Sequence, residues 1–340
     1  AGPGPGSGRG ARGSPAARPR AGQHAQVHDH QGFKQQAAAL AEEALAVLDG
    51  IEGSPYTLEA LLLAANSHRL GARRIQAAAM LNRCIDLGVD QDRRAYAARA
   101  HGSLGAMLAE DGNLLGAISH IEQETAYARL QQDPGWLVQA LCRLAACQRR
   151  QGRIDLAVDA LTEAHHAARR AELPYEQART DISRAALHLA LGDLERVGQL
   201  LGRNRVALHF GARTDLKLSY REIMAHYRLA EGDRLAALAT FQAAEAEADR
   251  TGFAILGAYF LGMIGVLTAD PDALLEAMDL LEDTGDRRLS ATLLYYGGTV
   301  GGDAEVLEFA VEEARVSGDR FLLLEVCLLY TSDAADEVVG

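Results

Sequence analysis

Residues 104–121 read LGAMLAEDGNLLGAISHI, residues 144–161 read LAACQRRQGRIDLAVDAL, and residues 224–241 read MAHYRLAEGDRLAALATF. In each stretch a glycine separates two runs whose apolar residues recur every three or four positions, the spacing of one helical face. Together with a weaker copy, these turn glycines stand 40 residues apart, at Gly112, Gly152, Gly192 and Gly232. A fixed period of this length indicates a solenoid, in which stacked helix pairs bury their apolar faces against each other. We therefore predict an all-α solenoid.

The residues around each turn resemble the tetratricopeptide repeat family. Its signature places a small residue in the first helix, glycine at the turn, alanine early in the second helix, a bulky residue four positions later and a small one three further on. The resemblance implies a right-handed α-solenoid of stacked antiparallel helix pairs. The clearest matches are Gly105, Gly112, Ala117 and Ile121; Ala145, Gly152, Ala157, Leu161 and Ala164; and Ala225, Gly232, Ala237, Phe241 and Ala244.

Weaker units flank the clear ones. The unit around Gly192 has Asn204 where a small residue belongs, Asp270-Pro271-Asp272 replaces a turn glycine, and a degenerate unit runs from about Arg287 to Ser317. We assign residues 33–326 to the repeat domain, with about seven to eight repeats. The period exceeds the standard repeat by about six residues, which adds about one turn to each helix.

The two ends are predicted to lie outside the fold. Residues 1–32 are rich in Gly, Pro and Arg, which predicts a disordered linker. Its Gly8–Gly13 segment formally matches GxGxxG but lacks the strand and helix of a dinucleotide site, and His24, His28 and His30 lack further metal ligands. We predict neither a cofactor nor a metal site.

Residues 327–340 form a tail that we expect to be non-native. The segment from Cys327 to Glu337, CLLYTSDAADE, resembles the conceptual translation of a transposase-type sequencing adapter. We expect the natural protein to match this sequence only as far as about Val326 and then to continue with different residues.

Composition excludes several function classes. The net charge of −12 argues against nucleic-acid binding by this segment, which needs dense positive charge. No apolar run is long enough to span a membrane, and the longest, Phe253–Thr268, contains three glycines and is predicted to be a buried helix. The four cysteines show neither a disulfide framework nor zinc spacing, so we expect buried thiols in a reducing, cytoplasmic compartment.

No catalytic pattern is present: the sequence has no GxSxG, HExxH, P-loop or kinase motif. We predict a non-enzymatic protein without a cofactor. Trp136, which follows Asp133-Pro134-Gly135 at a predicted helix start, is interpreted as an anchor between units.

The tetratricopeptide resemblance implies a concave binding groove lined by the first helix of each pair. An excess of Arg there would suit an acidic peptide tail, a carboxylate or a phosphate. The alternative is that these residues are ordinary solvated charges. The family's inward-facing positions fall on His68, Arg69 and Glu110, and the candidate groove residues are Arg99, Gln139, Arg149, Arg150, Arg179, Glu222 and His226.

The long repeats resemble those of bacterial signalling proteins, such as the large maltose-activator type of transcriptional regulators. The predicted function is therefore a protein- or peptide-binding scaffold, with acidic partners among the candidates, that forms the regulatory or sensory region of a larger bacterial signalling protein. The alternative is a small-molecule-sensing arm of a transcriptional regulator, a diguanylate or adenylate cyclase, or a histidine kinase whose effector domain lies outside this chain.

Overall fold

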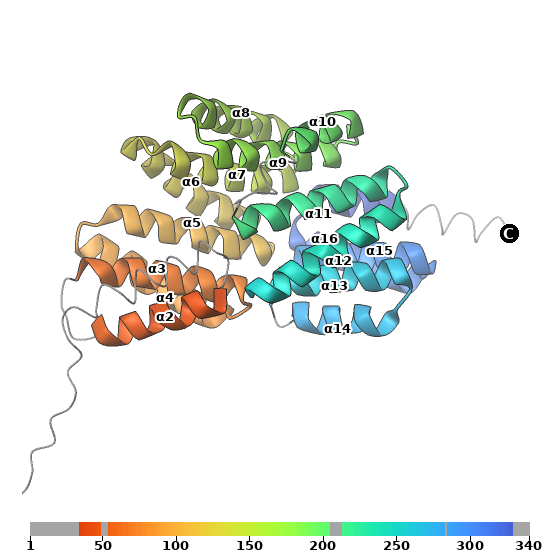
Figure 1. Ribbon diagram of the computed structural model, residues 1–340, viewed down its shortest axis with the longest axis horizontal. Helices are drawn as coiled ribbons and strands as arrows, with labels where there is room; N and C mark the ends of the chain where they lie inside the picture. Colours follow the sequence, from red (N-terminus) through yellow and green to blue (C-terminus); the bar gives the residue numbers. More distant parts are fainter. Residues whose placement is uncertain (1–33, 49–53, 205–212, 283, 329–340) are drawn as a thin grey trace, which may run out of the picture.

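The computed structural model describes residues 34–48, 54–204, 213–282 and 284–328, and every regular element in these ranges is a helix (Figure 1). The predicted linker 1–32, with its GxGxxG and histidine patterns, and residues 329–340 of the predicted tail lie outside the described residues. The helices are α2 (Lys34–Leu48), α3 (Pro55–Leu70), α4 (Arg74–Asp90), α5 (Arg94–Glu110), α6 (Leu114–Gln131), α7 (Pro134–Arg150), α8 (Ile154–Arg170), α9 (Pro174–Ala190), α10 (Leu194–Asn204), α11 (Thr214–Ala230), α12 (Arg234–Thr251), α13 (Ala254–Thr268), α14 (Pro271–Glu282), α15 (Arg287–Gly301), α16 (Ala304–Ser317) and a last helix over residues 320–328.

The periodic glycines form the turns within the pairs α5/α6, α7/α8, α9/α10 and α11/α12. All four have positive φ, from 73° at Gly192 to 86° at Gly112, a conformation that glycine adopts without steric cost. In each turn the following amide donates to the carbonyl oxygen five residues back, as Asn113 does to Leu108 at 2.9 Å. This is the hydrogen bond of a Schellman motif, which satisfies a helix-end carbonyl and sends the chain back antiparallel.

The signature positions form the contact between the two helices of each pair. Within the α5/α6 pair, a Cβ on Gly105 would lie 2.7 Å from the Ile121 side chain, so only a residue without a side chain fits there. The predicted all-α solenoid of stacked antiparallel pairs is confirmed. The other signature residues that are buried include Ala117, Ala157, Leu161, Ala164, Ala225, Ala237, Phe241, Ala244, Ala277 and Leu281.

The weak unit has a short second helix, since α10 spans 11 residues against 17 in its partner α9. Asn204 is nevertheless buried, and its amide group donates to the Leu200 carbonyl at 3.0 Å and to the Asp181 carboxylate at 3.1 Å. The Asn204 amide group is thus hydrogen-bonded within the α9/α10 pair, which explains how the unit tolerates a residue outside the signature.

The apolar segment that includes α13 is buried, as predicted. Tyr259, Phe260 and Met263 of this helix are fully buried in a core shared with α11, α12, α14 and α15. Among the described residues, no helix combines the length and the apolar character that crossing a membrane requires.

The first helices of successive pairs lie along the inside of the solenoid, and the two ends of the array meet. Contacts join α3 to α5, α5 to α7, α7 to α9, α9 to α11 and α13 to α15. Leu70 and Ala72, at the α3/α4 turn, pack against the core around α13. A Cβ on Gly112 would overlap the carbonyl oxygen of Val316, so the α5/α6 turn touches the end of α16. The array therefore closes on itself around its inner helices.

Candidate functional site

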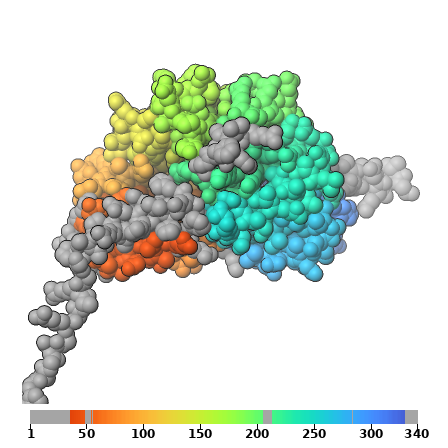
Figure 2. All heavy atoms as spheres, viewed as in Figure 1, coloured from red at the N-terminus to blue at the C-terminus, as the bar shows by residue number. Residues whose placement is uncertain are grey.

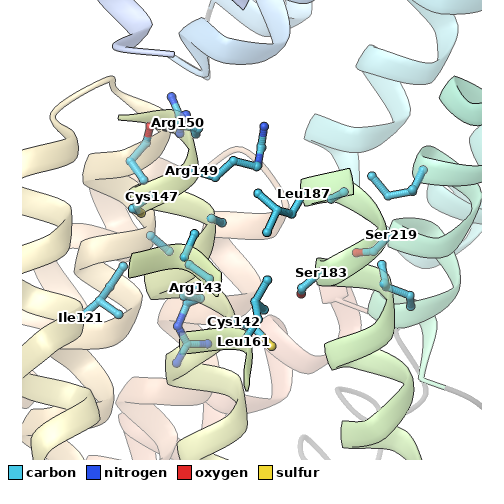
Figure 3. A pocket seen from close by; sticks show the side chains of 18 of the residues that line it. Ile121, Cys142, Arg143, Cys147, Arg149, Arg150, Leu161, Ser183, Leu187 and Ser219 are labelled. Carbon is cyan, nitrogen blue, oxygen red and sulfur yellow. Dashed lines mark hydrogen bonds between the residues drawn. The ribbon is translucent and has the colours of Figure 1, made fainter. Parts of the chain in front are cut away.

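A cavity of about 340 Å³ lies on the inner surface, between α5, α7, α9, α11 and the start of α15, and residues of α6 and α8 also line it (Figure 3). Its lining is mostly small or apolar, because the first helices carry alanine at the positions where they approach one another. Arginine, glutamate and serine side chains interrupt that lining. The apolar residues include Ala106, Ala109, Ala145, Ala186, Leu161, Ile182, Leu187 and Ile223.

Two predicted residues, Arg149 and Arg150, line this cavity from the last turn of α7 (Figure 3). Arg149 is half-buried and forms no hydrogen bond or ion pair with any residue that the structure describes. Burial lowers the pKa of its guanidinium, and the nearby Arg288 lowers it further, while Asp319 acts in the opposite direction. Arg149 therefore presents to the cavity a guanidinium without a hydrogen bond or ion pair among the described residues, while the Asp319 and Glu222 carboxylates lie close enough to favour its charge.

Arg150 is committed to holding the array closed. Its buried guanidinium donates to the Ala109 carbonyl at 2.7 Å and to the Ser317 carbonyl at 2.8 Å, and its Nε lies 3.7 Å from the Asp319 carboxylate. The bond to Ser317 joins residues 167 positions apart. Arg150 thus lines the cavity and also holds the end of α16 against α5 and α7.

Glu222 also lines the cavity, and it forms an ion pair with a lining residue that the sequence analysis did not single out. Arg288, at the start of α15, lies 3.6 Å from Glu222 and contributes to the same wall. The cavity lining holds four arginines, Arg143, Arg149, Arg150 and Arg288, and one acidic residue, Glu222. Three of these arginines form ion pairs, Arg143 with Glu124, Arg150 with Asp319 and Arg288 with Glu222. The 40-residue period could not reveal Arg288, because it enters the cavity only when the last repeats meet the first.

Two other predicted residues, Arg179 and Gln139, bridge neighbouring helices and do not line the cavity. Arg179 donates to Glu176 at 2.9 Å and to Asp215 at 3.1 Å, and Gln139 donates to Glu176 at 3.1 Å. These bonds link α7, α9 and the start of α11.

Arg99 lies over the Trp136 ring, 4.5 Å from its centroid, and 3.6 Å from Asp133. Trp136 is buried and donates through Nε1 to the Glu124 carboxylate at 2.8 Å, so it joins α7 to α6 as the anchor interpretation predicts. Asp133 accepts from the Trp136 amide at 3.0 Å and caps the helix.

The predicted groove residue His226 belongs to an aromatic cluster. Its Nε2 lies 2.6 Å from the Tyr259 hydroxyl and its Nδ1 lies 3.2 Å from the Tyr296 hydroxyl, while Phe241 meets the ring edge-on. Burial, together with the positive charge of Arg288, lowers the pKa of His226 to about 4. His226 is therefore neutral at physiological pH and contributes a hydrogen bond rather than a charge.

The inner region offers no metal site among the residues that the structure describes. Cys142 and Cys147 line the cavity as buried free thiols, and burial raises the pKa of both. Protonated thiols behave as small apolar groups, so they extend the apolar part of the lining.

Comparison with known proteins places the fold. No protein-family model and no curated protein matches the chain. Among solved structures, a Rap protein complexed with competence and sporulation factor aligns over 94% of this chain and 99% of its own, with 13% identity and a TM-score of 0.57. Aspartyl phosphate phosphatase F from Bacillus subtilis aligns over 97% and 96%, with 12% identity and a TM-score of 0.44. The repeat geometry and the likeness to the first of these structures show that the chain has the fold of a tetratricopeptide-like helical repeat protein.

Proposed function

We propose that this protein binds a peptide segment of a partner in the inner cavity, with an anionic group of the ligand against Arg149. The observation that carries the proposal is that Arg149 lines a largely apolar cavity without a hydrogen bond or ion pair among the described residues, whereas the other lining arginines are paired with carboxylates. A carboxylate placed there would gain charge-assisted hydrogen bonds from a guanidinium that already lies in the site. The cavity volume falls within the range of ligand pockets.

The proposed role is regulatory rather than catalytic. A Rap protein of similar fold was solved in complex with competence and sporulation factor, which supports binding of a partner by a helical array of this kind. We propose that the chain is the regulatory or sensory region of a larger bacterial signalling protein, and that ligand binding acts on an effector encoded with it.

The proposal is tested by selecting peptides from a randomised display library against the wild-type chain. Affinities of the enriched peptides are then measured by fluorescence polarisation for wild type, Arg149→Glu and Arg170→Glu. Arg170 is the matched control, because it is an exposed arginine at the end of the outer helix α8. We expect Arg149→Glu to weaken binding at least about tenfold and Arg170→Glu to leave it unchanged. Failure to enrich peptides, or equal binding by the two variants, would reject the proposal.

A small-molecule ligand is the second candidate, and the size of the cavity favours it. A volume of about 340 Å³ lies near the lower end of ligand pockets and suits a compact anionic metabolite. Thermal shift assays with a metabolite panel and with the selected peptides distinguish the two. A shift with metabolites that Arg149→Glu abolishes, without any peptide binding, would favour the second candidate.

A further inference from the structure

A second cavity, of about 530 Å³, lies between the outer helices α14 and α16, with α15 beneath it. Met278 of α14 and Leu294 of α15 are half-buried in it, and Phe309 of α16 stands at its edge with 67% of its surface exposed. None of these residues lines the inner cavity, so this groove is a separate surface.

Apolar side chains form part of the groove surface. Phe309 is the only phenylalanine among the large apolar residues that are exposed in the described ranges. An exposed aromatic ring beside a flexible methionine and a leucine is typical of surfaces that receive an apolar side chain of a partner. Such a surface buries the ring when the partner binds.

The rim of the groove is strongly acidic. Asp279 and Glu282 are exposed on the α14 side, and Glu313 lies on the α16 side, where it accepts from Arg287 at 2.8 Å. Over its whole length α14 carries four acidic residues and no basic one, and α16 carries four acidic residues and one basic. These two helices therefore contribute much of the net charge of −12.

We propose that the groove between α14 and α16 binds a basic amphipathic helix of a partner protein. Two roughly parallel helices with a third as floor form a trough that accepts one more helix, whose apolar face would cover Met278, Leu294 and Phe309. Lys or Arg residues flanking that face would lie against Asp279 and Glu282. Charge complementarity of this kind raises the association rate and excludes acidic competitors.

The same charges disfavour a second copy of this chain as the occupant. A symmetric dimer through the groove would bring the acidic faces of α14 and α16 against their own copies, and like charges at an interface are repulsive. The acidic rim also excludes the anionic ligand proposed for the inner cavity, so the two sites have opposite preferences.

The test uses a labelled helical peptide of Leu and Lys, with all Leu on one face, and an otherwise identical peptide of Leu and Glu. Fluorescence anisotropy is measured for wild type, for Phe309→Ala and for the double variant Asp279→Lys/Glu282→Lys. The control for Phe309→Ala is Leu275→Ala, which also truncates an exposed apolar residue but on α14 outside the groove. The control for the double variant is Asp272→Lys/Glu276→Lys, which makes the same change of charge on α14 outside the groove.

We expect the Lys peptide to bind wild type and both controls, and the two groove variants to bind at least about tenfold more weakly. Circular dichroism of each variant checks that it is folded. Hydrogen exchange of the wild-type protein, measured with and without the Lys peptide, tests the site without any substitution. We expect the peptide to slow exchange in α14 and α16. Equal weakening by groove and control variants, binding of the Glu peptide as tightly, protection elsewhere, or a wild-type dimer that Phe309→Ala dissociates would overturn the proposal.

Discussion

Two adjacent arginines at the end of α7 perform different tasks at the residue scale. Arg150 donates to two carbonyl groups and forms an ion pair with one carboxylate, whereas its neighbour Arg149 has no such partner among the described residues. Successive residues of a helix point in different directions, so one arginine can hold the array closed while the other faces the cavity.

Replacing Arg150 with Met is expected to destabilise the protein by about 3 kcal/mol, because it removes the donor to two carbonyl groups and the ion-pair partner of the buried Asp319 carboxylate. Arg149→Met removes no such bond and is expected to change the free energy of unfolding by less than about 0.5 kcal/mol. Urea denaturation of both variants measures the difference. Similar losses in the two variants would show that Arg150 does not hold the closure.

His226 is expected to make stability depend on pH. Its pKa is lowered to about 4 in the folded protein, so the unfolded chain binds more protons between pH 4 and pH 6.5. Stability should therefore fall as the pH drops through this window, with His226 accounting for at most about 3 kcal/mol. His226→Gln, which retains a hydrogen-bonding side chain without titrating there, should show a smaller loss between pH 7 and pH 4. Identical pH profiles for the two proteins would contradict the assignment.

At the element scale, the turn glycines have one backbone conformation and different surroundings. Gly112 and Gly232 have φ values of 86° and 83°. A Cβ on Gly232 would meet nothing within 4 Å, whereas one on Gly112 would overlap the Val316 carbonyl. The first turn is thus part of a contact between distant repeats, and the second is only a turn.

Gly232→Ala should therefore cost about 1 kcal/mol, the cost of placing alanine in a left-handed conformation. Gly112→Ala should cost at least about 1 kcal/mol more, because residues 316–317 must also move. Denaturant titration of the two variants compares them under one set of conditions. A smaller loss in Gly112→Ala than in Gly232→Ala would mean that the α5/α6 turn and α16 do not touch in solution.

Sequence reasoning predicted the elements well because each repeat is stabilised by local contacts. The turn glycines and the small residues such as Gly105 and Ala225 stand where a larger side chain would not fit. Because these positions recur every 40 residues, they can be recognised in the sequence. The irregular unit was also detectable from Asn204, although the hydrogen bonds that accommodate it were not.

At the scale of the whole molecule, the closure of the array was beyond sequence reasoning. A repeat pattern specifies how neighbouring units pack, and small rotations per unit accumulate into a shape that no single unit encodes. The Arg150–Ser317 contact and the entry of Arg288 into the cavity both depend on that shape. For this reason Arg149, Arg150 and Glu222 were found from their inward positions, while Arg288 was not.

Closure also gives the molecule two faces of opposite character. The inner cavity is largely apolar and holds Arg149 without a hydrogen bond or ion pair among the described residues, while α14 and α16 on the outside are acidic around an exposed Phe309. Figure 2 shows one face of the molecule, on which the described helices pack side by side. An anionic ligand is therefore expected inside and a basic partner outside.

The central claim is that the inner surface of the closed array is the binding site, and hydrogen exchange with and without a selected peptide tests it most directly. The account predicts that the peptide slows exchange in the inner helices around residues 142–150, 182–187 and 219–223, and that Arg149→Glu removes this protection. Protection confined to the outer helices, or protection that persists in Arg149→Glu, would contradict it.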